Sequence, residues 1–85
     1  MLTEELVNEF NEELRSLGCM FRYKYYTGLS IPSMEIEPIS MTHIDSYIIN
    51  VTDEFRTWMY DWFRKRGEEL NCNNTGSILW SYKGD

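Results

Sequence analysis

The chain has 85 residues, of which 42% are apolar and 15% aromatic, and its formal net charge at pH 7 is −6. This apolar content excludes a disordered chain, and no run approaches the roughly 18 apolar residues that a membrane-spanning helix needs. The length fits one domain over residues 1–85. The acidic, amphipathic start MLTEELVNEF lacks the features of a signal peptide, so we expect a cytoplasmic protein.

The first predicted element is an amphipathic helix between Thr3 and Gly18. Thr3 is a favourable N-cap, Leu2 can pack on Val7 as a hydrophobic staple, and Gly18 suits the position just past the helix end. At 100° per residue, one face collects Leu6, Val7, Phe10, Leu14 and Leu17. The opposite side carries Glu5, Glu9 and Glu12, with Glu13 at its flank. One face should therefore pack while the other displays carboxylates to water.

Two segments with alternating apolar and polar residues, 20–26 and 33–39, predict a β-hairpin. The connection between them contains Gly28 and Pro32, which both favour turns. Pro38 cannot donate a hydrogen bond to a neighbouring strand, so the second strand either ends there or lies at an edge.

Charge and apolar pairing favour one register for this hairpin, with Tyr26 opposite Ser33. This register places Tyr23 opposite Ile36, Lys24 opposite Glu35 and Arg22 opposite Glu37. Because both kinds of pairing agree, we predict this alignment of the strands.

The second half of the chain predicts two more strands and one helix. A loop over residues 40–46 precedes a strand over 47–51 (YIINV). A helix then begins at Thr52 or Asp53 and runs to Arg66 or as far as Leu70. The cluster NCNNTG breaks the helical pattern, and residues 77–83 form a last strand.

The predicted order is therefore α-β-β-β-α-β in an α+β fold. We expect an antiparallel meander of three strands plus a fourth C-terminal strand, with both helices packed on one sheet face. The fourth strand lies either parallel to the third through a right-handed crossover or antiparallel at another edge.

The aromatic stretch FRTWMYDWFRKRG (55–67) is predicted to be core rather than a binding surface. Its bulky apolar side chains fall on one helical stripe: Phe55, Trp58, Met59, Trp62 and Phe63. Tyr60 lies off this stripe and should be exposed or at the rim of the core. Arg66 lies in line with the stripe, so its stem should pack there and its head should reach a carboxylate or a carbonyl. The cations of Arg64, Lys65 and Arg66 also suit a helix C-terminus.

The sequence offers no convergent set of catalytic or metal-binding residues. Its one histidine, His43, lies in a predicted loop near Asp45, with no serine or cysteine nucleophile tied to this pair by sequence. Cys19, Cys72 and His43 lack the short spacing of a zinc site. A disulfide between the two cysteines is one alternative, but in a chain without a secretory signal we expect thiols. We therefore predict a non-enzymatic protein without a metal or cofactor.

Direct nucleic-acid binding is an alternative interpretation. The order α-β-β-β-α over residues 3–66 resembles that of double-stranded-RNA-binding domains, which implies an RNA- or DNA-binding module. Those domains open their second helix with a lysine cluster, whereas this chain has Asp53-Glu54-Phe55 at these positions. The resemblance is therefore one of topology alone.

The acidic outer face of the first helix is the candidate protein-binding site, formed by Glu5, Glu9, Glu12 and Glu13. Carboxylates at i, i+4 on a helix lie about 5–6 Å apart at their bases, close to the phosphate spacing along a nucleic-acid strand. Such a face can occupy the basic groove of a nuclease-type or other nucleic-acid enzyme. In size, charge and element order the chain is similar to small acidic anti-CRISPR and related phage inhibitors, which implies nucleic-acid mimicry in the cytoplasm of a host.

We therefore expect an acidic inhibitor whose partner is a protein with a basic surface, acting as a monomer or small homo-oligomer without membrane contact. The main alternative is a phage or bacterial accessory or structural subunit whose protein partner is unrelated to nucleic acid.

Overall fold

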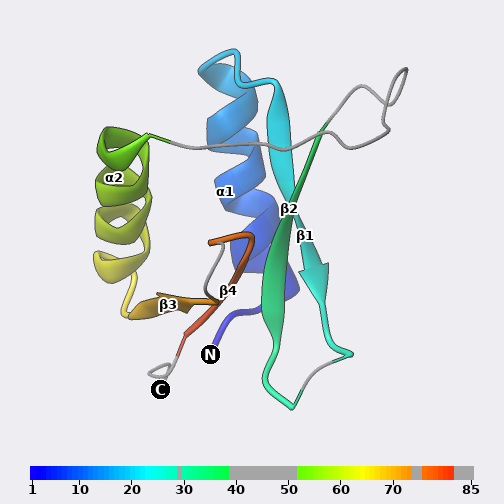
Figure 1. Ribbon diagram of the computed structural model, residues 1–85. Helices are drawn as coiled ribbons and strands as arrows, with labels where there is room; N and C mark the ends of the chain where they lie inside the picture. The colour runs from blue at the N-terminus through cyan, green and yellow to red at the C-terminus, as the bar shows by residue number, and fades with distance from the viewer. Residues whose placement is uncertain (29, 39–51, 74–75, 82–85) are drawn as a thin grey trace.

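The computed structural model describes residues 1–28, 30–38, 52–73 and 76–81 (Figure 1). Its elements are α1 (Glu4–Ser16), β1 (Phe21–Tyr26), β2 (Ser33–Pro38), α2 (Asp53–Arg64), β3 (Leu70–Cys72) and β4 (Ile78–Ser81). The predicted α+β class is confirmed, but a short strand, β3, follows α2 where none was expected. The predicted strand over 47–51 and the loop that holds His43 lie outside the described residues.

The four strands form one antiparallel sheet in the order β1-β2-β4-β3. β4 pairs with β2 across Ser33–Glu35, so the C-terminal strand lies inside the sheet next to β2. The predicted meander gave this place to its third strand, over residues 47–51, which lies outside the described residues. The C-terminal strand is antiparallel, as one of the two predicted placements has it, but it lies between β2 and β3 and not at an edge. β3 and β4 pair with each other, with Cys72 opposite Leu79, and they enter the sheet as a hairpin beside β2.

The predicted register of the first hairpin is confirmed at every pair. Tyr26 lies opposite Ser33, and Tyr23 lies opposite Ile36. Arg22 also lies opposite Glu37, and its Nε donates to Glu37 Oε2 at 3.0 Å. Opposite charges and apolar partners therefore specify the same alignment.

Both helices begin at a threonine N-cap. The Oγ1 atoms of Thr3 and Thr52 accept hydrogen bonds from the backbone N–H groups of Leu6 and Phe55, at 3.1 and 3.0 Å. Each bond satisfies one of the N–H groups that the first turn of a helix leaves without a backbone partner.

Both helices end at a glycine in the left-handed conformation, Gly18 with φ 77° and Gly67 with φ 86°. At each end the glycine N–H and the following N–H bond back to the last turn, which is the Schellman motif. Gly67 therefore ends α2 sooner than predicted, and the chain does not continue as helix to Arg66 or Leu70. Leu70 is still buried, but as the first residue of β3.

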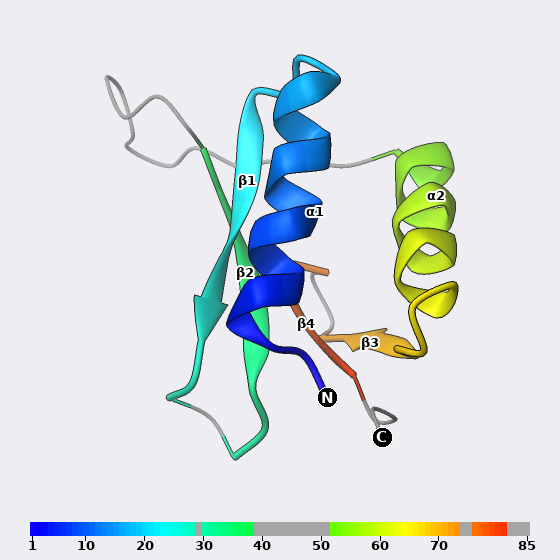
Figure 2. The same ribbon diagram turned by 180° about the vertical axis from the view of Figure 1, so that it is seen from behind.

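The core lies between the helices and one face of the sheet. Figure 2 shows α1 in front of β1 and β2, with α2 standing beside α1 on the side of β3. Phe10 of α1 is fully buried at the centre, with its ring centroid 4.9–5.9 Å from those of Tyr23, Trp58, Trp62 and Phe63. Met34 and Leu79, paired across β2 and β4, belong to the same buried cluster. The prediction that both helices pack on one sheet face is confirmed.

Candidate functional site

The four predicted site glutamates all lie on the solvent side of α1. Glu5, Glu9, Glu12 and Glu13 are exposed. The opposite side of the same helix is fixed to the core by Val7, Phe10 and Leu14, each at most 1% exposed. The amphipathic spacing of the sequence therefore anchors one face of α1 and turns its carboxylates outward.

Two of these carboxylates are engaged in ion pairs within the chain. Glu12 pairs with Arg15 one turn further along α1, and Glu9 Oε2 lies 3.7 Å from Arg66 Nε. Among the described residues, Glu5 and Glu13 have no cationic partner. All four side chains are largely exposed, and exposed ion pairs of this kind contribute only about 0.2–1 kcal/mol. A cationic partner can therefore compete for Glu9 and Glu12 at low cost.

Arg66 links the end of α2 to α1. Its guanidinium carbon lies 3.5 Å from the centroid of the Trp62 ring, and its Nη1 donates to the Trp62 carbonyl at 2.9 Å. The head of Arg66 was predicted to reach a carboxylate or a carbonyl, and with the ion pair to Glu9 it reaches both. The stacked guanidinium holds Glu9 beside the junction of the two helices.

Tyr60 lies at the rim of the core, as predicted, half-buried against β3. Its hydroxyl donates to Cys72 Sγ at 3.5 Å. Burial, with this hydrogen bond as the next contribution, raises the pKa of Tyr60 to about 12. Cys72 and Cys19 are both free thiols.

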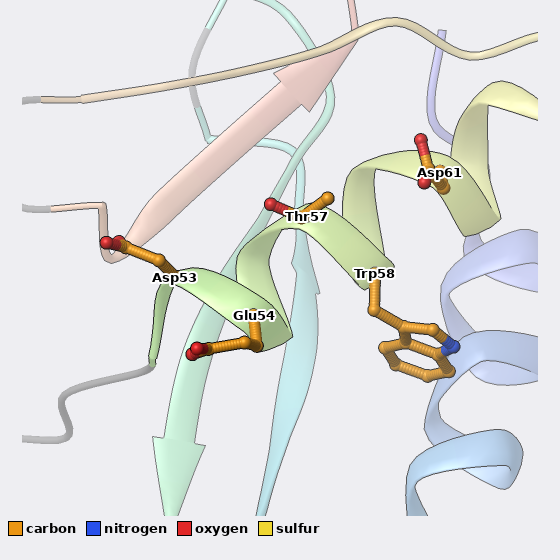
Figure 3. A pocket seen from close by; sticks show the side chains of 5 residues that line it. All are labelled: Asp53, Glu54, Thr57, Trp58 and Asp61. Atoms are coloured by element: carbon orange, nitrogen blue, oxygen red, sulfur yellow. The ribbon is translucent and has the colours of Figure 1, made fainter.

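A second acidic surface, on the outer side of α2, was not predicted as a site. Asp53, Glu54 and Asp61 surround a hollow that Thr57 and Trp58 also line (Figure 3). Trp58 points from this hollow toward α1, where the centroid of its ring lies 5.6 Å from that of the Phe10 ring.

The signal for this surface was present in the sequence. Asp53 and Glu54 open the predicted second helix, and Asp61 lies two helical turns beyond Glu54 on the same side. Asp53 forms an ion pair with Arg56, in which Oδ1 lies 3.3 Å from Nη1, and Asp61 forms an ion pair with Arg64. Within the described part of the chain, Glu54 has no such partner.

Across the described ranges, no three His, Cys, Asp or Glu side chains are grouped as metal ligands would be. No helix in these ranges combines the length and the apolar character needed to cross a membrane. No protein-family model matches the chain, and neither a curated protein nor a solved structure is significantly similar to it.

Proposed function

We propose that this protein is a small, non-enzymatic binding domain that presents the carboxylates of α1 to the cationic surface of a partner protein. The observation that carries this proposal is the anchored acidic face of α1. Glu5, Glu9, Glu12 and Glu13 lie outside, while Phe10 and its neighbours fix the helix to the core. Because the helix cannot rotate, the carboxylates keep the spacing of a helical surface, about 5–6 Å between the bases of neighbours.

A row of negative charges held at this spacing suits the basic groove of a nucleic-acid enzyme. Such grooves bind phosphates along a strand, and their affinity is dominated by electrostatic contacts. The net charge of −6 adds a long-range attraction that speeds association with a cationic partner. The proposed activity is therefore inhibition by nucleic-acid mimicry, of the kind that phage anti-CRISPR and other anti-defence proteins exert in a host cytoplasm.

An accessory or structural subunit of a phage or bacterial assembly is the second candidate. Leu17 is 63% exposed and Met20 is 74% exposed, and neighbouring exposed apolar side chains are typical of protein interfaces. The RNA-binding alternative is not favoured, because the first turn of α2 carries Asp53 and Glu54, which repel phosphates.

The test compares two charge-reversed variants that carry the same net charge. E5K/E12K changes the acidic face, whereas E35K/E69K changes exposed glutamates of β2 and of the turn before β3. Wild type and both variants are immobilised and exposed to a bacterial lysate, and retained proteins are identified by mass spectrometry. We expect wild type and E35K/E69K to retain a nucleic-acid-binding protein that E5K/E12K loses, while thermal unfolding shows that both variants remain folded.

Two outcomes would contradict the proposal. Retention of the same partner by all three proteins would remove α1 from the interface. Retention of a partner that binds no nucleic acid, by any of them, would favour the accessory-subunit function instead.

A further inference from the structure

An apolar groove lies between the end of α1 and the start of α2. Its walls are formed by Leu14, Leu17, Cys19, Glu54, Phe55 and Trp58, and its volume is about 380 Å³. Leu14 is buried, whereas Leu17 remains 63% exposed although it borders this concave apolar surface. We call this feature the inter-helix groove.

The groove is a consequence of how the two helices meet. Their closest aromatic contacts gather around Phe10, which touches Trp58, Trp62 and Phe63. Beyond this point α1 ends at the Gly18 turn, and Leu17 is left at the helix end. Leu17 and the neighbouring Trp58 wall therefore offer apolar surface that the core of the described residues does not use.

Carboxylates border this apolar surface from α2. Glu54 forms part of the groove wall and also of the acidic hollow next to it, and Trp58 is likewise shared by both. Asp53 and Asp61 also line the hollow. On α1, Glu13 lies one helical turn before Leu17 and is exposed. Both Glu13 and Glu54 lack an ion-pair partner among the described residues.

We propose that the inter-helix groove holds a bulky apolar side chain from a partner segment whose neighbouring residues are lysine or arginine. The apolar walls favour the anchor, because burial of Leu17 and Trp58 surface is favourable. The carboxylates of Glu13 and Glu54 select cationic flanks and reject acidic ones, as in other grooves that bind amphipathic helices. This inference rests on the proposed function, which makes the partner cationic, and adds the apolar anchor that such a partner must carry.

The probes are three synthetic helical peptides of the same length. The first carries leucines at i, i+3 and i+4 flanked by lysines, the second replaces the leucines with alanine, and the third replaces the lysines with glutamate. Binding is followed by two-dimensional NMR of the labelled protein. We expect the first peptide alone to shift the Trp58 indole signal and the amides of Cys19 and Glu54.

Two neutral truncations serve as variant and matched control. Leu17→Ser removes the exposed groove wall, and Met20→Ser removes another largely exposed apolar side chain that does not line the groove. We expect L17S to weaken binding of the first peptide about tenfold, because it loses apolar contact with the anchor, and M20S to leave it unchanged. E54Q should weaken binding mainly at low salt.

Three outcomes of the peptide titrations would overturn the inference. The first is equal affinity of wild type and L17S for the first peptide. The second is equal binding of the lysine and glutamate peptides, and the third is the absence of NMR shifts at the groove residues. Concentration-dependent shifts of the same signals without peptide would identify a second copy of the chain as the occupant and would also overturn it. E5K/E12K should still bind the peptide, so loss of lysate partners by that variant tests the proposed function separately.

Discussion

Asn11 joins α1 to β1 at the edge of the described sheet. Its side-chain amide donates to the Tyr23 carbonyl at 2.7 Å and accepts from the Tyr23 N–H at 2.9 Å. Among the described strands β1 lies at the edge of the sheet, and this amide takes the place that a neighbouring strand would take beside Tyr23. One polar side chain thus satisfies two backbone groups and joins α1 to β1.

Asn11→Ala should destabilise the protein by about 1–3 kcal/mol, because it leaves two partly buried backbone groups without their partner. The matched control is Asn8→Ala, which changes an exposed asparagine on the same helix. Urea unfolding of both variants measures the difference. Equal stabilities of N11A and N8A would show that the Asn11 contacts contribute nothing.

Tyr60 should make the stability of the fold depend on alkaline pH. Burial raises its pKa to about 12, and burial raises the pKa of Tyr23 as well. A tyrosine in the unfolded chain loses its proton near pH 10, so between about pH 10 and 12 the folded state holds more protons than the unfolded state. The stability that the fold gains from keeping Tyr60 protonated is therefore fully present below pH 10 and is lost as the pH rises toward 12.

The check is the free energy of unfolding in urea at several pH values between 9 and 12. Tyr60→Phe should show a shallower decline with pH than wild type, whereas Tyr26→Phe, at an exposed position, should follow wild type. Identical slopes for wild type and Y60F would rule out Tyr60 as a source of the pH dependence.

At the scale of the element, the ends of both helices are set by single glycines. Gly18 was recognised in the sequence because the apolar pattern of α1 stops before it. Gly67 was overlooked, because Arg66 and Leu70 continue the apolar stripe of α2 by spacing alone. The left-handed turn at Gly67 ends the helix although the spacing continues. Leu70 is buried as the first residue of β3 instead.

Gly67→Ala should cost roughly 1 kcal/mol of stability, because φ is 86° and an L-residue is strained there. A Cβ at this position meets nothing within 4 Å, so the cost comes from the backbone and not from a clash. Gly67→Asn should cost less, because asparagine tolerates this conformation better. Urea unfolding that ranks G67A equal to or above G67N would contradict this explanation of the helix end.

Local pairing of strands could be predicted from the sequence, whereas pairing between distant strands could not. The β1–β2 register followed from neighbouring residues, since Arg22 and Glu37 as well as Tyr23 and Ile36 agree on one alignment. The place of β4 in the sheet did not follow from the sequence, because Met34 and Leu79 are far apart in the chain and no local pattern selects their pairing. The three residues of β3 are too few to show an alternation at all.

At the scale of the whole molecule, the two helices carry aromatic residues of the core on one side and the candidate binding surfaces on the other. The exposure of Glu5 and Glu12 followed from helical periodicity alone. The ion pair of Glu9 with Arg66 and the inter-helix groove depend on how two helices sit against each other, which the sequence does not state. The parts of the site that lie on one element were therefore predictable, and those shared by two were not.

The central claim is that the acidic face of α1 competes with nucleic acid for a protein, and displacement from DNA–cellulose tests it most directly. A bacterial lysate is bound to the matrix and eluted at constant ionic strength with wild type, E5K/E12K or E35K/E69K. We predict that wild type and E35K/E69K release the same nucleic-acid-binding protein and that E5K/E12K releases little of it. Equal release by all three proteins, or no release by wild type, would contradict the account.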